Sequence, residues 1–245
     1  MIYFITGGAQ GIGFETAREL SSKGHKVCLF DLTDPAPAAT TLQGDAMAVQ
    51  GDVTRKEDID AAIGKTVDTF GGLDCVVTAA GIVKVGPSID VNPDDFARTM
   101  AINVTGTFLT AQSGAGHMAG TGGGNIVFVG SVYGEGGAPQ RASYCASKGA
   151  VHNLTRSLAV EWAPMGIRVN AVAPTGVRTP MVQNLIDKGI YDMKGVKNRT
   201  PLGRIAEPKE VASAIEFLAS PGASMITGVI LPVDGGWTAN GYTTG

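Results

Sequence analysis

A tyrosine and a lysine four residues apart, Tyr144 and Lys148, are the residues of this sequence best suited to acid/base chemistry. They stand at the start of a helical pattern, where this spacing places both side chains on one helix face. The pKa of a free tyrosine is about 10, and a nearby ammonium lowers it because the positive charge favours the phenolate. The pair therefore predicts a general acid/base that moves a proton to or from an alcohol oxygen.

Ser131 follows an apolar strand expected at Ile126–Val129, and its hydroxyl is a second hydrogen-bond donor for the same substrate oxygen. A tyrosine and a lysine at this spacing are also a common surface pair, so the motif alone does not establish catalysis. The elements that position these residues must decide between the two interpretations.

A glycine-rich turn joins the first expected strand, Ile2–Ile5, to the first expected helix, Gly11–Lys23. Gly7, Gly11 and Gly13 let the backbone approach a pyrophosphate closely, and the helix N-terminus presents free N–H groups to the anion. The spacing Gly-x-x-x-Gly-x-Gly differs from the general Gly-x-Gly-x-x-Gly fingerprint. Its place between a strand and a helix still indicates a dinucleotide cofactor, although a glycine turn alone can be structural.

Asp31 ends the second strand about 20 residues beyond the glycine turn, where a carboxylate hydrogen-bonds the adenosine ribose of a dinucleotide. A carboxylate at this point repels the 2′-phosphate of NADP. No lysine or arginine stands in the turn at Gly8, Ala9 or Gln10, or directly after Asp31. The cofactor is therefore predicted to be NAD. The alternative is that Asp31 only ends a strand.

Other strand ends suit further parts of the cofactor. Asp52 and Val53 follow the third strand, where the carboxylate accepts from the adenine amine and the valine covers the ring edge. Small residues at 78–81 end the fourth strand and leave room for the cofactor along the edge of the sheet. The turn at 174–179 ends the sixth strand, where its backbone and hydroxyl groups suit a nicotinamide carboxamide.

Two features keep two interpretations each. Asn103 is a polar residue in an apolar stretch of the helix expected at Asp94–Met118. It is either a satisfied core amide that kinks the helix or one station of a proton relay to solvent. The segment at about 181–200 has mixed polarity and several charges. It is either a lid that closes over the substrate or a tolerant surface excursion.

Short apolar runs alternate with longer amphipathic runs along the chain. The expected strands are Ile2–Ile5, Lys26–Phe30, Ala46–Gln50, Cys75–Thr78, Ile126–Val129, Arg168–Ala173 and Val229–Val233. The expected helices are Gly11–Lys23, Lys56–Phe70, Asp94–Met118, Tyr144–Ala163 and Pro208–Ala219. This alternation predicts an α/β fold with a doubly wound parallel sheet (a Rossmann fold) and helices on both faces. Without a linker or repeat, residues 1–245 are predicted to form a single domain, with a mobile tail from Asn240.

The composition excludes several classes of partner. The net charge is −3 and no basic run is present, which argues against nucleic acid or an anionic membrane. No apolar run has the length of a membrane span, and the chain opens directly on a strand, so we expect no signal peptide. Cys28, Cys75 and Cys145 have unrelated spacings, which predicts neither a disulfide framework nor a metal site. The default location is a reducing cytoplasm.

Taken together, these motifs resemble the short-chain dehydrogenase/reductase family in its compact branch, over nearly the whole chain. The matching residues are Thr6-Gly7-x-x-x-Gly11-Ile12-Gly13, Asp31, Asp52-Val53, Ala80-Gly81, Asn103, Ser131, Tyr144-x-x-x-Lys148 and Pro174-x-Gly176-Val177-x-Thr179. The sequence departs from the family where Thr78-Ala79 replaces a frequent Asn-Asn and where Thr175 replaces a frequent glycine. Neither change touches the catalytic set.

The resemblance implies a role for each matching residue. Tyr144 is the general acid/base, Ser131 orients the reacting carbonyl or alcohol, Lys148 lowers the tyrosine pKa and binds the nicotinamide ribose, and Asn103 holds a water molecule of the relay. The expected cofactor-binding residues are Gly7, Gln10, Gly11, Ile12, Gly13, Asp31, Leu32, Asp52, Val53, Ala79, Ala80, Gly81, Tyr144, Lys148, Pro174, Val177 and Thr179. The family also implies a homotetramer, with the helices at 94–118 and 144–163 packed between subunits.

The function expected from the sequence is an NAD-dependent oxidoreductase that interconverts a secondary alcohol and its ketone. A polyol, a cyclic alcohol and a small hydroxy ketone fit about equally as substrate. Three alternatives stay open: a 3-oxoacyl-thioester reductase of the same family, a non-catalytic NAD-binding sensor or scaffold, and a sugar-nucleotide epimerase or dehydratase. The last is disfavoured because the chain is too short for an extra substrate domain.

Overall fold

Seven strands form one parallel sheet in the computed structural model, which describes residues 1–241. They are β1 (Ile2–Thr6), β2 (Lys26–Asp31), β3 (Ala46–Gln50), β4 (Cys75–Thr78), β5 (Gly124–Val129), β6 (Ile167–Pro174) and β7 (Ile230–Val233). Their order is β3-β2-β1-β4-β5-β6-β7 with every neighbouring pair parallel, so the sheet is built outward from β1 in both directions. The predicted doubly wound α/β fold is confirmed. Residues 242–245 of the tail expected to be mobile lie outside the described residues.

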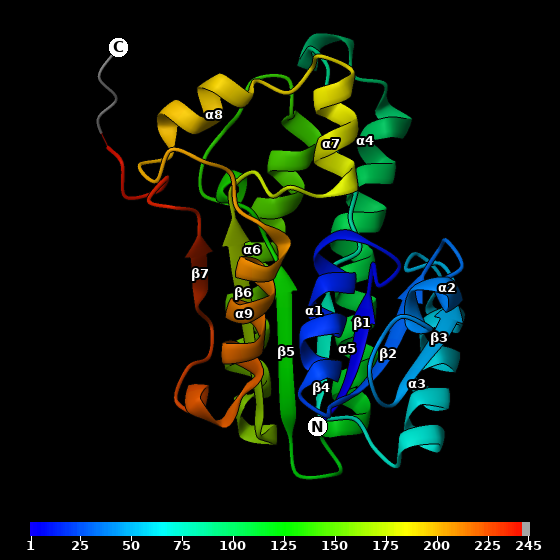
Figure 1. The fold of residues 1–245 in the computed structure, drawn as a ribbon. Coiled ribbons are helices and arrows are strands. Elements are labelled where there is room, and N and C mark those ends of the chain that lie inside the picture. The colour runs from blue at the N-terminus through cyan, green and yellow to red at the C-terminus, as the bar shows by residue number, and fades with distance from the viewer. Residues whose placement is uncertain (242–245) are drawn as a thin grey trace.

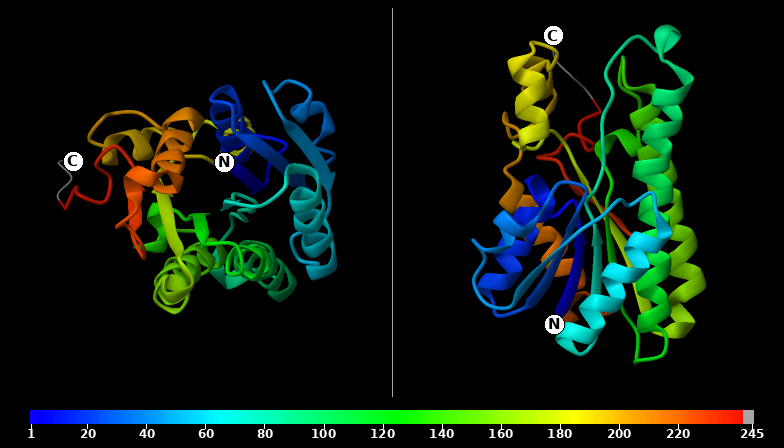
Figure 2. Two further views of the ribbon diagram at one scale, coloured as in Figure 1. Left: turned by 90° about the horizontal axis from the view of Figure 1, so that it is seen from below. Right: turned by 90° about the vertical axis from the view of Figure 1, so that its right-hand side faces the viewer.

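Helices cover both faces of this sheet. They are α1 (Gly11–Ser22), α2 (Ala36–Ala39), α3 (Lys56–Phe70), α4 (Pro93–Met100), α5 (Gly106–Met118), α6 (Ala142–Trp162), α7 (Pro180–Asp187), α8 (Met193–Arg199) and α9 (Pro208–Ala219). Figure 2 shows α5 and α6 on one face and α1 and α9 on the other. In Figure 1, α7 and α8 lie beyond the carboxyl ends of the strands, where the predicted substrate site is.

Two hydrophobic cores result, one on each face. Successive strand residues point to opposite faces, so Phe4 joins the core under α3, α5 and α6, while Ile5 joins the core under α1 and α9. Both side chains are fully buried. This explains why the strands read as continuous apolar runs instead of alternating patterns.

Two helix predictions need correction. The helix expected at Asp94–Met118 is interrupted, because a π-helical segment at Ala101–Thr105 separates α4 from α5. Such a segment inserts an extra residue into a helical turn and is frequent at functional sites. The helix expected at Tyr144–Ala163 begins at Ala142, two residues before the predicted start, so Tyr144 lies within its first turn. The segment at 181–200, expected as a lid or a surface excursion, contains most of α7 and all of α8.

No helix within residues 1–241 has the length and apolar character needed to cross a membrane. In the same part of the chain, no group of three or more histidine, cysteine, aspartate or glutamate side chains is arranged to hold a metal ion.

Close packing of α5 on β4 depends on a glycine. A Cβ atom on Gly114 would overlap the side chain of Val76, whereas a Cβ on Gly116, two residues along the same helix, would meet open space. We predict that Gly116→Ala stabilises the protein by about 0.5–1 kcal/mol, because alanine favours the helix. Gly114→Ala should destabilise it by about 1–3 kcal/mol through overpacking. Urea unfolding of both variants measures the difference. Equal changes would contradict a packing constraint at position 114.

Candidate active site

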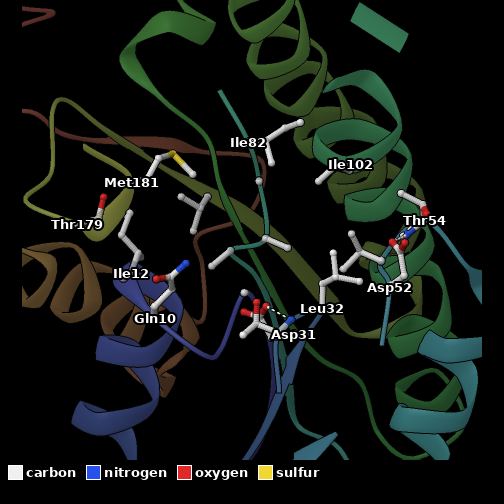
Figure 3. A pocket seen from close by; sticks show the side chains of 18 of the residues that line it. Gln10, Ile12, Asp31, Leu32, Asp52, Thr54, Ile82, Ile102, Thr179 and Met181 are labelled. Carbon is white, nitrogen blue, oxygen red and sulfur yellow. Dashed lines mark hydrogen bonds between the residues drawn. The ribbon is translucent and has the colours of Figure 1, made fainter. Parts of the chain in front are cut away.

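A cavity of about 610 Å³ lies at the carboxyl ends of the strands, where the sheet order reverses between β1 and β4. Such a switch point is where ligands bind in open α/β sheets. The cavity brings together most of the residues selected from the sequence. Those that line it are Gly7, Gln10, Gly11, Ile12, Asp31, Leu32, Asp52, Val53, Ala79, Ala80, Gly81, Tyr144, Lys148 and Thr179. Figure 3 shows Gln10, Asp31, Asp52 and Thr179 around its walls.

The remaining predicted residues lie outside the lining. Gly13 packs inside the glycine turn, where a Cβ would overlap the carbonyl of Gly7. Pro174 is the buried last residue of β6, and Val177 is buried beside Ala206. Ser131 and Asn103 are also buried. Gly13 therefore shapes the turn from within, and cofactor contact by Pro174 and Val177 stays a prediction.

The glycine turn suits a dinucleotide because residues without side chains let a pyrophosphate approach the backbone closely. Gly7 and Gly11 adopt positive φ angles of 66° and 63°. A Cβ on Gly7 would lie 2.7 Å from the backbone nitrogen of Ala80, so the turn packs directly on the end of β4. The N-terminus of α1 then faces the cavity with backbone N–H groups that suit a pyrophosphate.

Hydrogen bonds hold two carboxylates at the wall of the cavity. Asp31 accepts hydrogen bonds from the backbone nitrogens of Ala9 and Thr33, each at 3.0 Å. Asp52 accepts from the backbone nitrogen and the hydroxyl of Thr54, each at 2.8 Å. These bonds fix both carboxylates at the cavity wall (Figure 3), where an adenosine would lie in the predicted orientation.

Tyr144 and Lys148, the predicted acid/base pair, lie next to each other in the same cavity. Lys148 donates to the carbonyl oxygen of Val129 at 2.7 Å, and its nitrogen lies 5.6 Å from the centre of the Tyr144 ring. Burial raises the pKa of Tyr144 to about 12, while a hydrogen bond with Ser131 acts in the opposite direction. Burial also lowers the pKa of Lys148 to about 8. The lowered tyrosine pKa expected from the sequence is therefore wrong for the protein groups alone, because desolvation of the phenolate dominates.

Asn103 lies in the π-helical segment and connects two parts of the site. Its side-chain oxygen accepts from the backbone nitrogen of Ile82 at 2.8 Å. Its amide nitrogen donates to the Ile82 carbonyl at 2.9 Å and to the Ser147 hydroxyl at 3.0 Å. The side chain thus ties the loop after β4 to α6 beside Lys148, as a satisfied core amide does. The relay role stays a prediction.

Sequence reasoning missed His152, which lies four residues after Lys148 on the same helix face. Its Nε2 atom accepts from the backbone nitrogen of Ser131 at 3.5 Å, and its Nδ1 atom lies 3.2 Å from a carboxylate oxygen of Glu135. Burial lowers the pKa of His152, with Glu135 opposing this shift, and the neutral form is the one that accepts from Ser131. The helical spacing from Lys148 was the available signal.

Glycines make room for this histidine. A Cβ on either Gly130 or Gly134 would lie 2.5 Å from a ring atom of His152. Other lining residues carried no sequence motif and were also missed. They are Thr33, Thr54, Ile82, Arg98, Ala101, Ile102, Val129 and Pro180. Met181, the first residue of the segment expected as a lid, also lines the cavity.

Comparisons with known proteins agree with this geometry. A family model described as enoyl-(acyl carrier protein) reductase matches residues 7–238. A cis-4-hydroxycyclohexanecarboxylate dehydrogenase of Sinomonas cyclohexanicum is 41% identical over 240 residues, covering 96% of this chain and 95% of that protein. A 2-(S)-hydroxypropyl-CoM dehydrogenase of Xanthobacter autotrophicus is 40% identical over 243 residues, covering 96% of this chain and 95% of that protein.

A solved structure also resembles this chain over nearly its whole length. The 3-ketoacyl-(acyl-carrier-protein) reductase of Brucella melitensis, complexed with NADH, superimposes with a TM-score of 0.90 at 33% identity, covering 97% of this chain and 98% of that one. Both the match of the family model to most of the chain and the full-length relatives above 30% identity agree with the Tyr144 and Lys148 geometry. The chain belongs to the short-chain dehydrogenase/reductase family.

Proposed function

We propose that this protein is an NAD-dependent dehydrogenase that interconverts a secondary alcohol and its ketone, with Tyr144 as the general acid/base. One observation carries the proposal. A single cavity is lined by Tyr144 and Lys148 and by the carboxylates of Asp31 and Asp52. Asp31 ends β2, whereas Lys148 is bonded to the end of β5, three strands along the sheet. A dinucleotide whose adenosine lies at Asp31 then extends across the glycine turn toward Tyr144.

Each catalytic side chain has a distinct task. A bound nicotinamide would supply the hydride acceptor for oxidation of the carbinol carbon and the hydride donor for reduction of the ketone. Tyr144 as phenolate takes the hydroxyl proton in oxidation, and as phenol it gives that proton to the carbonyl oxygen in reduction. Ser131 donates a hydrogen bond to the same oxygen. The ammonium of Lys148, below its pKa of about 8, favours the phenolate electrostatically.

The cofactor preference rests on Asp31. Its carboxylate lines the cavity where the adenosine ribose is proposed to bind, and a 2′-phosphate there would place two anions together. The residues proposed to bind the cofactor are those selected from the sequence. Those among them that line the cavity are proposed to contact the cofactor directly. The NADH complex of the Brucella melitensis reductase supports a nicotinamide cofactor without deciding between NAD and NADP for this chain.

A cyclic or other secondary alcohol is the proposed substrate class. Two relatives near 40% identity are named for a hydroxycyclohexanecarboxylate and a hydroxypropyl-CoM, and both names describe hydroxy compounds. The segment 181–200 is proposed as the lid, since Met181 lines the cavity and α7 begins beside it. A homotetramer through α4–α5 and α6, as in the family, is part of the proposal. The buried free thiols of Cys28 and Cys75 suit a cytoplasmic location.

Removal of the phenol tests the reaction. Tyr144→Phe should lower turnover of a cyclic alcohol on the order of 10²–10⁴-fold, because no group of comparable reach moves the proton. NAD binding, measured by calorimetry, should stay near the wild-type value. In the wild type, alcohol oxidation should rise from neutral to alkaline pH as the phenolate fraction grows. Undiminished turnover in Tyr144→Phe would refute the assignment, and NAD binding without turnover of alcohols, ketones or 3-oxoacyl thioesters would favour the sensor alternative.

Exchange of the ribose-binding acid tests the cofactor. Asp31→Ser should reduce the preference for NAD over NADP by about tenfold or more, because the repulsion of the 2′-phosphate is removed. The ratio of kcat/KM for the two cofactors measures this effect. Asp34→Asn, at an exposed aspartate in the following loop, is the matched control and should leave the ratio unchanged. A wild-type preference for NADP would show that Asp31 has another role.

We also expect His152 to position Ser131. His152→Gln should lower kcat by about tenfold, because the backbone nitrogen of Ser131 loses its buried acceptor and the hydroxyl shifts. The Kd for NAD should change little, since His152 does not line the cofactor cavity. Asn153→Ala, at the exposed neighbouring position on α6, serves as control. A parallel loss of NAD affinity and kcat would point to general misfolding instead of positioning.

A further inference from the structure

Two arginines flank a group of aromatic rings beside the general acid/base. The ring of Tyr133 lies 6.5 Å from that of Tyr144 and 6.1 Å from that of Trp237, edge-on to both. The guanidinium of Arg141 lies 6.0 Å from the centre of the Tyr133 ring, and that of Arg199 lies 4.8 Å from the centre of the Trp237 ring. Cations and rings therefore form one connected surface, which we call the arginine–aromatic surface.

Neither arginine is neutralised by a carboxylate. Among residues 1–241, no ion pair involves Arg141 or Arg199. Arg178 and Arg204, by contrast, pair with glutamates at 2.9 Å and 2.7 Å. Arg141 donates one hydrogen bond, to the carbonyl of Pro139 at 3.1 Å, which leaves most of its donors for a ligand.

The charge of Arg141 reaches the catalytic centre. Burial raises the pKa of Tyr133, Tyr144 and Tyr191, and the positive charge of Arg141 opposes this rise at all three. The negative charge of Asp192 acts in the other direction and raises the pKa of Tyr133. Its carboxylate is engaged as the cap of α8, where it accepts from the backbone nitrogen of Gly195 at 2.8 Å.

The backbone before Arg141 is held in an unusual conformation. Gln140 has a φ angle of 62°, a positive value that no other non-glycine residue within 1–241 adopts. Its carbonyl oxygen accepts from the backbone nitrogen of Gly86 at 2.9 Å, which anchors this conformation to the loop after β4. Left-handed backbone at such a residue persists only where its surroundings enforce it. The backbone next to Arg141 is therefore held in place by its contact with the loop after β4.

We infer that the alcohol substrate carries a carboxylate, which Arg141 and Arg199 bind while the hydroxyl group lies at Tyr144. The inference rests on the proposed function and names the substrate class of the same site. A guanidinium forms paired hydrogen bonds with a carboxylate, and the rings of Tyr133 and Trp237 supply contact for the apolar body of the substrate. Since Arg199 lies in the last turn of α8, the bound anion also holds the proposed lid in place.

Substrate discrimination is the first test. With NAD, cis-4-hydroxycyclohexanecarboxylate should be oxidised with a kcat/KM at least about 10-fold above that of its methyl ester and of cyclohexanol. Arg141→Gln and Arg199→Gln should each lower kcat/KM for the acid by about 10- to 100-fold, mainly through KM. In both variants, kcat/KM for cyclohexanol should fall less than kcat/KM for the acid, because cyclohexanol has no carboxylate for the arginines to bind. Arg18→Gln, at a surface arginine on α1, is the control and should change neither substrate. Equal kcat/KM values for acid and ester would overturn the inference and leave the proposed function intact.

Binding gives a second test that needs no turnover. Cyclohexanecarboxylate should change the tryptophan fluorescence of the NAD-saturated protein. The guanidinium of Arg199, which is proposed to bind the carboxylate, lies over the ring of Trp237. It should bind at least about 10-fold more tightly than the neutral cyclohexanecarboxamide, and Arg141→Gln should abolish this difference. Equal binding of acid and amide would refute the carboxylate site. Arginine-dependent binding of the acid, in a protein that oxidises no alcohol, would keep the site and reject the proposed dehydrogenase.

Discussion

The hydrogen bond from the Lys148 ammonium to the Val129 carbonyl is the interaction on which the active site depends. It joins the first turns of α6 to the carboxyl end of β5 at 2.7 Å. A buried ammonium without a carboxylate partner is costly, and this cost is what lowers the pKa of Lys148 to about 8. The bond therefore holds beside Tyr144 an ammonium that loses its proton near pH 8. The same burial keeps Tyr144 protonated at neutral pH.

The elements around this bond are arranged to keep it dry and in register. The π-helical segment Ala101–Thr105 places Asn103 so that its amide ties the loop after β4 to α6. His152, one helical turn beyond Lys148, accepts from the backbone of Ser131 through space left by two glycines. The three candidate residues Asn103, Ser131 and Lys148, on separate elements, thus each make a buried polar contact with a neighbouring element. Such satisfied networks make one arrangement of a core much more favourable than others.

The same architecture separates the general chemistry from the choice of substrate. The glycine turn, Asp31 and Asp52 line the cavity and are proposed to bind the dinucleotide. The arginine–aromatic surface, formed by Tyr133, Arg141, Arg199 and Trp237, adjoins Tyr144 and is carried by loops and short helices. Loops tolerate substitution better than the sheet does, so a family can keep the hydride chemistry and exchange the substrate.

Much of this protein was determined by local sequence pattern. Apolar runs bounded by turns identified the seven strands of the described residues, because strands covered on both faces are apolar at most positions. The Gly7–Gly13 turn, Asp31 and the Tyr144–Lys148 spacing are short-range motifs whose chemistry follows from neighbours in the chain. Only the tertiary structure decided what depends on distant neighbours. The pKa of Tyr144 is set by burial, which no spacing reveals, and His152 gains its contact with Ser131 from packing across 21 positions. Asn103 in the π-helical segment likewise contacts Ile82 and Ser147, which are distant in the sequence. The residues of the arginine–aromatic surface also come from separate segments, and only the folded chain brings them together.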